Sequence, residues 1–198
     1  MKKRIIGIAC VCAVAALSLT ACGGNKTYGK LNSLIAKTPS EAELVVTVTA
    51  DGETLSGEYS LSEQDGGYVV EYTYERLSTF DASDDGYIIP DAVKTTYEGS
   101  VVVKDGKIVQ QNGDTADLTF EQMTASGVKF DETYFSNAVI DDGSVIADVS
   151  DPEAFLQSDI TCTDMQMKVL FTDDAITSLT VSYTSAAGAQ VVIEYTFG

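Results

Sequence analysis

An alternation of apolar and polar residues with a period of two constrains the fold of this chain more than any other feature. Pairs such as Asp51-Gly52 and Asp65-Gly66 divide the alternating segments, and they favour tight turns between antiparallel strands. The pattern predicts a three-stranded meander with one apolar face. The side chains of that face are Leu44, Val46 and Val48, then Leu55, Gly57, Tyr59 and Leu61, then Tyr68, Val70, Tyr72 and Tyr74.

Further strands and short helices are predicted along the rest of the chain. Asp105-Gly106 favours a hairpin turn. Thr119 and Gln122 have the spacing of a capping box at the start of a helix, and Gly127 would end that helix. Residues 78–95 form a long acidic connection. Residues 134–140 fit a helix or a strand. The sequence predicts an α+β fold, in which a curved antiparallel sheet of about eight or nine strands packs against two or three short helices. The predicted strands are 96–104, 107–111, 144–149, 165–171, 176–183 and 190–197, and the predicted helices are 27–37, 119–126 and 152–157.

The N-terminus has the features of an export signal. Three basic residues precede the apolar run from Ile5 to Leu19, which is shorter than a membrane-spanning helix. The run ends in Leu19, Thr20, Ala21 and Cys22, and this motif resembles the lipobox of bacterial lipoproteins. The resemblance implies removal of residues 1–21 and attachment of a lipid to Cys22. It also implies a body held on the extracytoplasmic side of the cell membrane by acyl chains.

Composition limits what the mature protein can do. Removing 21 of the 198 residues leaves 177, a length that fits one domain. We expect residues 22–26 to be a flexible lipidated tether and residues 27–198 to be that domain. The removed segment holds three of the 12 basic residues and none of the 30 acidic ones, so the mature net charge is −21. Such a body cannot neutralise phosphates, and we expect no nucleic-acid partner.

Neither an enzyme nor a metal protein is expected, and no cofactor is implied. The chain has no histidine, which removes the usual nucleophile–base pairs and the commonest transition-metal ligand. Cys162 is the only cysteine after Cys22, and we interpret it as a small buried apolar residue. Three adjacent aspartate pairs lack the spacing of a calcium loop and are typical of turns; they are Asp84-Asp85, Asp141-Asp142 and Asp173-Asp174.

Tyrosines on the predicted strands are the best candidates for a ligand site. If the sheet curves around a cavity, their rings would line it with apolar bodies and polar tips. The alternative is that they pack in an ordinary core or cover the outer face. The candidates are Tyr68, Tyr72, Tyr74, Tyr183 and Tyr195.

The order of elements resembles the half-barrel lipoproteins and lipoprotein carriers of the LolA type and the LppX/LprG type. A short helix, a meander, a helical middle and a terminal run of strands carry this resemblance across residues 27–198. It implies a curved sheet that wraps short helices and holds acyl chains between them. We therefore expect a membrane-anchored binding module for a lipid or another apolar ligand. The alternative is a structural or protein-interaction lipoprotein whose acidic face meets a basic envelope protein.

Overall fold

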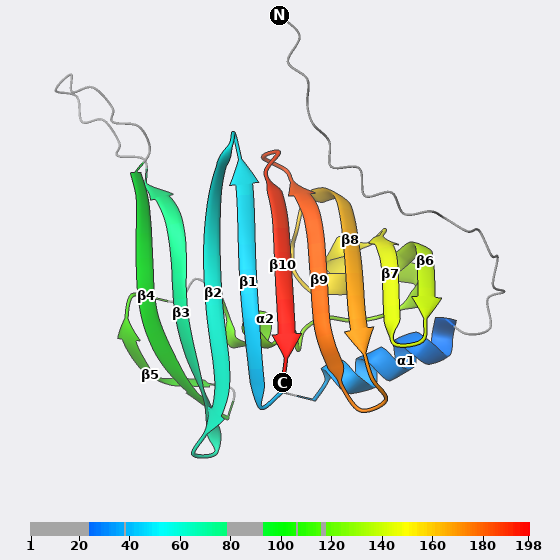
Figure 1. Cartoon of the computed structure of the whole chain (residues 1–198), viewed down its shortest axis with the longest axis horizontal. Helices are drawn as coiled ribbons and strands as arrows, with labels where there is room; N and C mark the ends of the chain where they lie inside the picture. Colours follow the sequence, from blue (N-terminus) through cyan, green and yellow to red (C-terminus); the bar gives the residue numbers. More distant parts are fainter. Residues whose placement is uncertain (1–23, 38, 79–92, 106, 116–117) are drawn as a thin grey trace, which may run out of the picture.

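The computed structural model describes residues 24–37, 39–78, 93–105, 107–115 and 118–198. Within them, ten strands form one antiparallel sheet, and three α-helices and a 3-10 turn lie beside it (Figure 1). The helices are α1 (Gly24–Ile35), α2 (Phe120–Thr124) and α3 (Pro152–Leu156), and the 3-10 turn is η1 (Glu132–Tyr134). The strands are β1 (Glu41–Ala50), β2 (Glu53–Gln64), β3 (Gly67–Ser78), β4 (Val93–Lys104), β5 (Lys107–Gly113), β6 (Phe135–Asp141), β7 (Ser144–Val149), β8 (Cys162–Phe171), β9 (Ile176–Ser185) and β10 (Gln190–Phe197).

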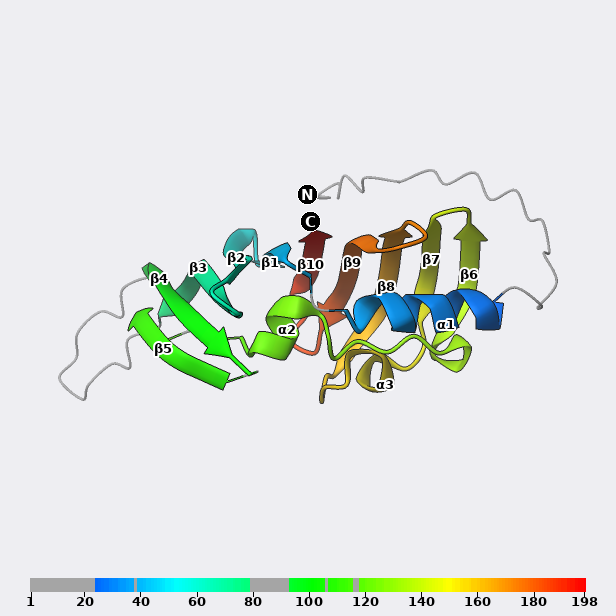
Figure 2. The same ribbon diagram turned by 90° about the horizontal axis from the view of Figure 1, so that it is seen from below.

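Two meanders make up the sheet, and they meet at its centre. The strand order is β5-β4-β3-β2-β1-β10-β9-β8-β7-β6, so the pairing of β1 with β10 joins the two halves. Because β5 and β6 lie at opposite edges, the chain between them must cross the whole sheet. This crossover carries α2 and η1 and runs along one face (Figure 2).

The face that carries the crossover is the inner face, and α1, α2 and α3 all lie against it (Figure 2). The predicted alternation is confirmed, because Leu44, Tyr59, Leu61 and Val70 point inward and are buried. In α1, Tyr28, Leu31, Leu34 and Ile35 are buried in the same core cluster. The predicted fold class is therefore confirmed: a curved antiparallel sheet packs against short helices.

Turn residues set the register of the first meander. Asp51 and Gly52 both have positive φ, at 51° and 85°, and Asp65 and Gly66 do the same at 51° and 74°. Two successive left-handed residues are what a tight hairpin with right-handed twist requires, and Asp and Gly tolerate them best. The turns predicted at these two pairs are thus confirmed.

Several boundaries differ from the predictions. The first helix begins at Gly24 and ends at Ile35, so residues 24–26, expected in the tether, form its first turn. The helix predicted over 119–126 is shorter, and the left-handed residue after it is Ala125 rather than Gly127. Residues 134–140 are mostly strand β6, which raises the strand count to ten. The acidic connection is shorter than predicted, since β3 reaches Ser78 and β4 begins at Val93; residues 79–92, with Asp84 and Asp85, lie outside the described residues.

Candidate functional site

Three of the candidate tyrosines lie in the packed core and bind the crossover. Tyr72 and Tyr74 of β3 and Tyr195 of β10 are 3%, 5% and 9% exposed. The Tyr72 hydroxyl donates to the carbonyl of Asp114. The Tyr74 hydroxyl lies 2.7 Å from the carbonyl oxygen of Thr115, and the Tyr195 hydroxyl lies 2.6 Å from that of Gln122. These hydroxyls hold the crossover on the inner face.

The other two candidates are only partly buried. The ring of Tyr68 lies 5.5 Å from that of Phe120, at the start of α2. Tyr183 lies on β9, where burial, and secondarily the charge of Cys162, raises its pKa. Cys162 packs against the core but is partly exposed, rather than buried as predicted, and its partial burial raises the pKa of the thiol.

The structure brings the β3 tyrosines together with two that sequence reasoning did not select. Tyr59 lies 6.1 Å from Tyr72 between ring centroids, and Tyr97 stacks on Tyr74 at 5.2 Å. Pairing of β2, β3 and β4 places these rings side by side. A tyrosine on one strand identifies such a cluster only once the register of its neighbours is known.

Burial of Tyr195 has an electrostatic consequence. Removal from water raises the pKa of its phenol well above the usual range, and the charge of Tyr183 adds to this effect. The hydroxyl is protonated at physiological pH, as that of an ordinary tyrosine is, and it donates to the Gln122 carbonyl of the crossover.

The outer face of the first meander carries an open groove of about 620 Å³, which we call the trough. Its floor is the backbone of one row of paired residues, three with side chains that point inward and two glycines. The floor row is Leu44, Tyr59, Tyr72, Gly99 and Gly113, one residue from each of β1 to β5.

The rows on either side of the floor form the walls of the trough. One wall consists of Glu43, Ser60, Glu71, Ser100 and Asn112, and the other of Val45, Glu58, Thr73 and Glu98. The four glutamates therefore alternate from wall to wall on successive strands. The walls are about 7 Å apart along the strands, and five strands span about 19–24 Å across them.

The trough is acidic along β1 to β4. Within the described part of the chain, no lysine or arginine lines it and none of the four glutamates forms an ion pair. The nearest compensated carboxylate lies in the next row, where Glu75 is 2.9 Å from Lys94 Nζ. Hydrogen bonds from Lys94 and Ser56 lower the pKa of Glu75. The trough thus presents uncompensated negative charge to an incoming ligand.

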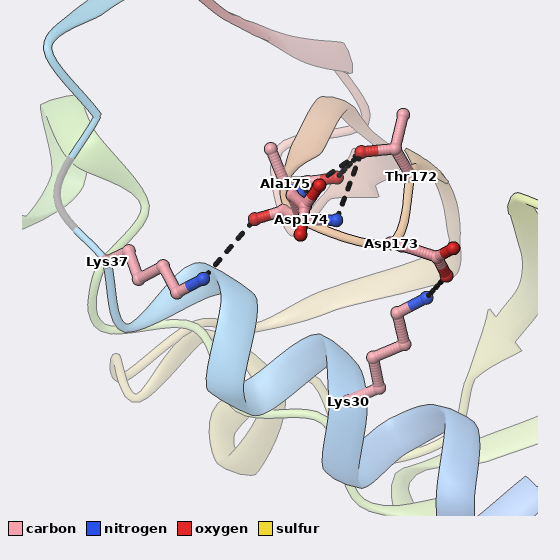
Figure 3. Close-up of polar contacts among 6 residues, drawn as sticks. All are labelled: Lys30, Lys37, Thr172, Asp173, Asp174 and Ala175. Carbon is pink, nitrogen blue, oxygen red and sulfur yellow. Dashed lines mark hydrogen bonds and ion pairs between the residues drawn. The ribbon is translucent and has the colours of Figure 1, made fainter.

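A second, smaller pocket of about 120 Å³ lies at the C-terminal end of α1. Leu34, Ile35, Pro39, Ile176 and Phe197 give it a mostly apolar lining. Asp174 and Ala175, in the turn between β8 and β9, also line it. Two lysines of the α1 region bind this turn (Figure 3).

The contacts of that turn explain the pair Asp173-Asp174. Lys30 Nζ lies 2.7 Å from Asp173 Oδ1, and Lys37 Nζ donates to the carbonyl of Asp174 at 3.3 Å (Figure 3). The hydrogen bond from Lys30 lowers the pKa of Asp173. Asp141-Asp142 likewise lies at the β6–β7 turn. Among the described residues, no group of acidic and cysteine side chains is arranged to hold a metal ion.

The predicted lipobox, Leu19, Thr20, Ala21 and Cys22, lies outside the described residues. Within the described residues, no helix is both long and apolar enough to cross a bilayer.

Comparison with known proteins gives little further information. No family model matches the chain, and no curated protein matches it. One solved structure to which it is similar is a DUF1329 family protein from Desulfovibrio piger ATCC 29098, at 8% identity and a TM-score of 0.29. The alignment covers 87% of this chain and 91% of that one. A likeness at this TM-score supports no conclusion about fold or function.

Proposed function

We propose that this protein is an exported, lipid-anchored interaction module that binds a basic, extended segment of an envelope protein in the trough. The observation that carries the proposal is the alternation of Glu43, Glu58, Glu71 and Glu98 between the two walls. The role is binding rather than catalysis. The anchor is the lipid predicted on Cys22, which holds the body at the outer face of the cell membrane.

The dimensions of the trough favour an extended polypeptide. A length of about 19–24 Å accommodates about five to seven residues at 3.3–3.6 Å each. Successive side chains of an extended chain point to opposite sides, so lysines or arginines at neighbouring positions reach both walls. The hydroxyl and amide groups between the glutamates can bond to the peptide backbone.

The test uses a nine-residue peptide made of three Lys-Lys-Thr repeats, which presents lysines on both sides of an extended chain. It is labelled for fluorescence anisotropy and mixed with the mature protein. We expect binding that weakens with added salt, because the contacts are charge pairs near the surface. The combined variant Glu43→Gln, Glu58→Gln, Glu71→Gln and Glu98→Gln should lose roughly ten-fold or more in affinity.

A matched variant removes four exposed carboxylates elsewhere: Glu53→Gln, Glu63→Gln, Glu132→Gln and Glu153→Gln. Equal losses in the two variants would mean that the peptide responds to net charge alone, and the trough would be rejected. A crosslinking group placed at Ser60 would then capture the partner protein in intact host cells, so that it can be identified. Repeated failure to recover one basic protein would count against the proposal.

The apolar pocket beside α1 supports a second candidate, a binding module for a lipid or another apolar ligand. The pocket is apolar, lies between helix and sheet, and has Lys37 at its rim, which suits an anionic head group. Native mass spectrometry of protein purified from its own host tests this candidate. If the purified protein carries no ligand and does not bind an added fatty acid, this second candidate function is excluded.

A further inference from the structure

Exposed apolar side chains gather at one corner of the outer face. Val139, Ile146 and Leu170 are 53%, 46% and 36% exposed, and they are half of the large apolar side chains that the described residues expose. Val139 of β6 pairs directly with Ile146 of β7. Ile146 pairs with Lys168 of β8, two residues before Leu170. These three apolar residues, with Lys168 at the β8 end of the row, form what we call the β6 patch.

The β6 patch lies at the edge of the sheet where the N-terminal helix begins. In both views α1 starts beside β6 and runs toward the middle of the sheet (Figures 1 and 2). The ring of Tyr28, in the first half of α1, stacks on that of Phe135 of β6 at 5.2 Å. The start of the described chain is therefore fixed to this edge by packing.

After the predicted removal of residues 1–21, only Cys22 and Gly23 would precede α1. Gly24 follows the predicted lipidated residue, Cys22, by two positions, and two residues of extended chain span at most about 7 Å. A lipid on Cys22 would bring the β6 edge close to the membrane surface. An exposed apolar patch at the same edge would then lie where lipid can cover it.

We propose that the β6 patch rests on the lipid bilayer as a second membrane contact, which orients the body with β6 toward the membrane. The inference rests on the lipid anchor in the proposed function. Apolar side chains at a membrane interface enter the boundary between head groups and acyl chains. Lys168, beside Ile146 and Leu170, can extend its ammonium group to a lipid phosphate while its methylenes stay against these apolar side chains.

Charge explains why a second contact is useful. The body is strongly acidic, and Asp141 and Asp148 flank the β6 patch on the same face. Anionic head groups repel such a surface, so charge does not hold the body against the membrane. The acyl chains fix only the start of the chain and do not by themselves set the orientation of the body. The apolar contact fixes one edge against the membrane and leaves the trough, on β1 to β5 of the same face, at the far end of the sheet.

The experiment exploits the absence of tryptophan from the chain, since one substitution then creates a unique fluorophore. Val139→Trp places it in the β6 patch, and Val109→Trp places it on β5 at the opposite edge. The two valines match well, since both lie on edge strands and are 53% and 58% exposed. Each full-length variant is purified from membranes and reconstituted in vesicles of phosphatidylcholine with a minority of phosphatidylglycerol, with and without brominated acyl chains.

We expect brominated lipid to lower the emission of Val139→Trp roughly two-fold and to leave that of Val109→Trp nearly unchanged. The mass of the purified protein shows separately whether Cys22 is acylated. An acylated protein whose two tryptophans are quenched equally, or not at all, would overturn the membrane contact and leave the anchor standing. A protein without acylation would overturn the anchor and this orientation together.

Discussion

Gly99 contributes both to the packing of the inner face and to the shape of the outer face. It pairs with Tyr72 on one side and Gly113 on the other, and it forms part of the trough floor. The Tyr72 side chain passes over Gly99 to reach the carbonyl of Asp114. A glycine here lets one tyrosine bind the crossover without bending β4.

A methyl group at this position should therefore be costly. The Cβ of Gly99→Ala would lie 2.6 Å from the Tyr72 hydroxyl and 2.7 Å from the carbonyl oxygen of Asn112, so backbone must move. We expect a loss of about 1–3 kcal/mol in the free energy of unfolding, measured with urea. The matched control is Gly29→Ala, in the interior of α1 with no atom within 4 Å of its Cβ.

That control should stabilise the protein by about 0.5–1 kcal/mol, because alanine favours a helix over glycine. If Gly99→Ala unfolded at the same urea concentration as the wild type, the close approach of Tyr72 would not constrain β4.

At the scale of elements, the short helix α2 positions the crossover. Thr119 Oγ1 accepts from the Gln122 backbone at 3.2 Å, and Gln122 Oε1 accepts from the Thr119 backbone at 2.9 Å. The Gln122 carbonyl in turn accepts from Tyr195. One turn of helix, capped at its start, thus links the middle of the crossover to the central strand β10.

Removing the cap should loosen this link. Thr119→Ala leaves the Gln122 amide without its side-chain acceptor, and we expect a loss of about 1 kcal/mol in unfolding free energy. Thr119→Ser keeps the hydroxyl and should lose much less. Hydrogen exchange would localise the effect, with faster exchange at Met123 and Val128 in the alanine variant. Equal stability of the two variants would show that the cap does not support α2.

Local chemistry made some elements predictable from sequence and left others hidden. The capping box at Thr119 and the Asp51-Gly52 turn depend on residues within a few positions, so the sequence alone indicated them. Strand β6 was ambiguous because its pairing shifts between Ser136 and Val139, around Asn137 at φ 51°, and the shift interrupts the alternation. The trough was hidden for a different reason: only the register of four strands brings Glu43 and Glu98 into one groove.

At the scale of the whole molecule, the order of strands separates the two proposed surfaces. The β6 patch lies at one edge, and the trough begins at β1, five strands away, and ends at β5, the opposite edge. At about 4.8 Å per strand, the trough lies roughly 25–45 Å from the β6 edge along the sheet. With β6 against the membrane, the trough would lie at the far end of the sheet from the bilayer, where a protein partner can reach it.

An acidic trough should reduce the stability of the free protein. Neighbouring glutamates on opposite walls are about 8 Å apart by sheet geometry, and each pair repels by about 0.5 kcal/mol in water at low ionic strength. Three neighbouring pairs give about 1–2 kcal/mol, and 0.1 M salt screens roughly half of it. Replacing Glu43, Glu58, Glu71 and Glu98 with glutamine should therefore raise Tm by about 3–6 °C at low salt.

The same substitution should raise Tm about half as much in 0.1 M salt. Calorimetry at the two salt concentrations measures both shifts. The variant at Glu53, Glu63, Glu132 and Glu153 removes the same charge from separated positions and should gain less. A trough variant that melts below the wild type would mean that these carboxylates stabilise the fold through contacts of their own. A gain in stability together with a loss of peptide binding is expected of a surface whose charge serves recognition rather than folding.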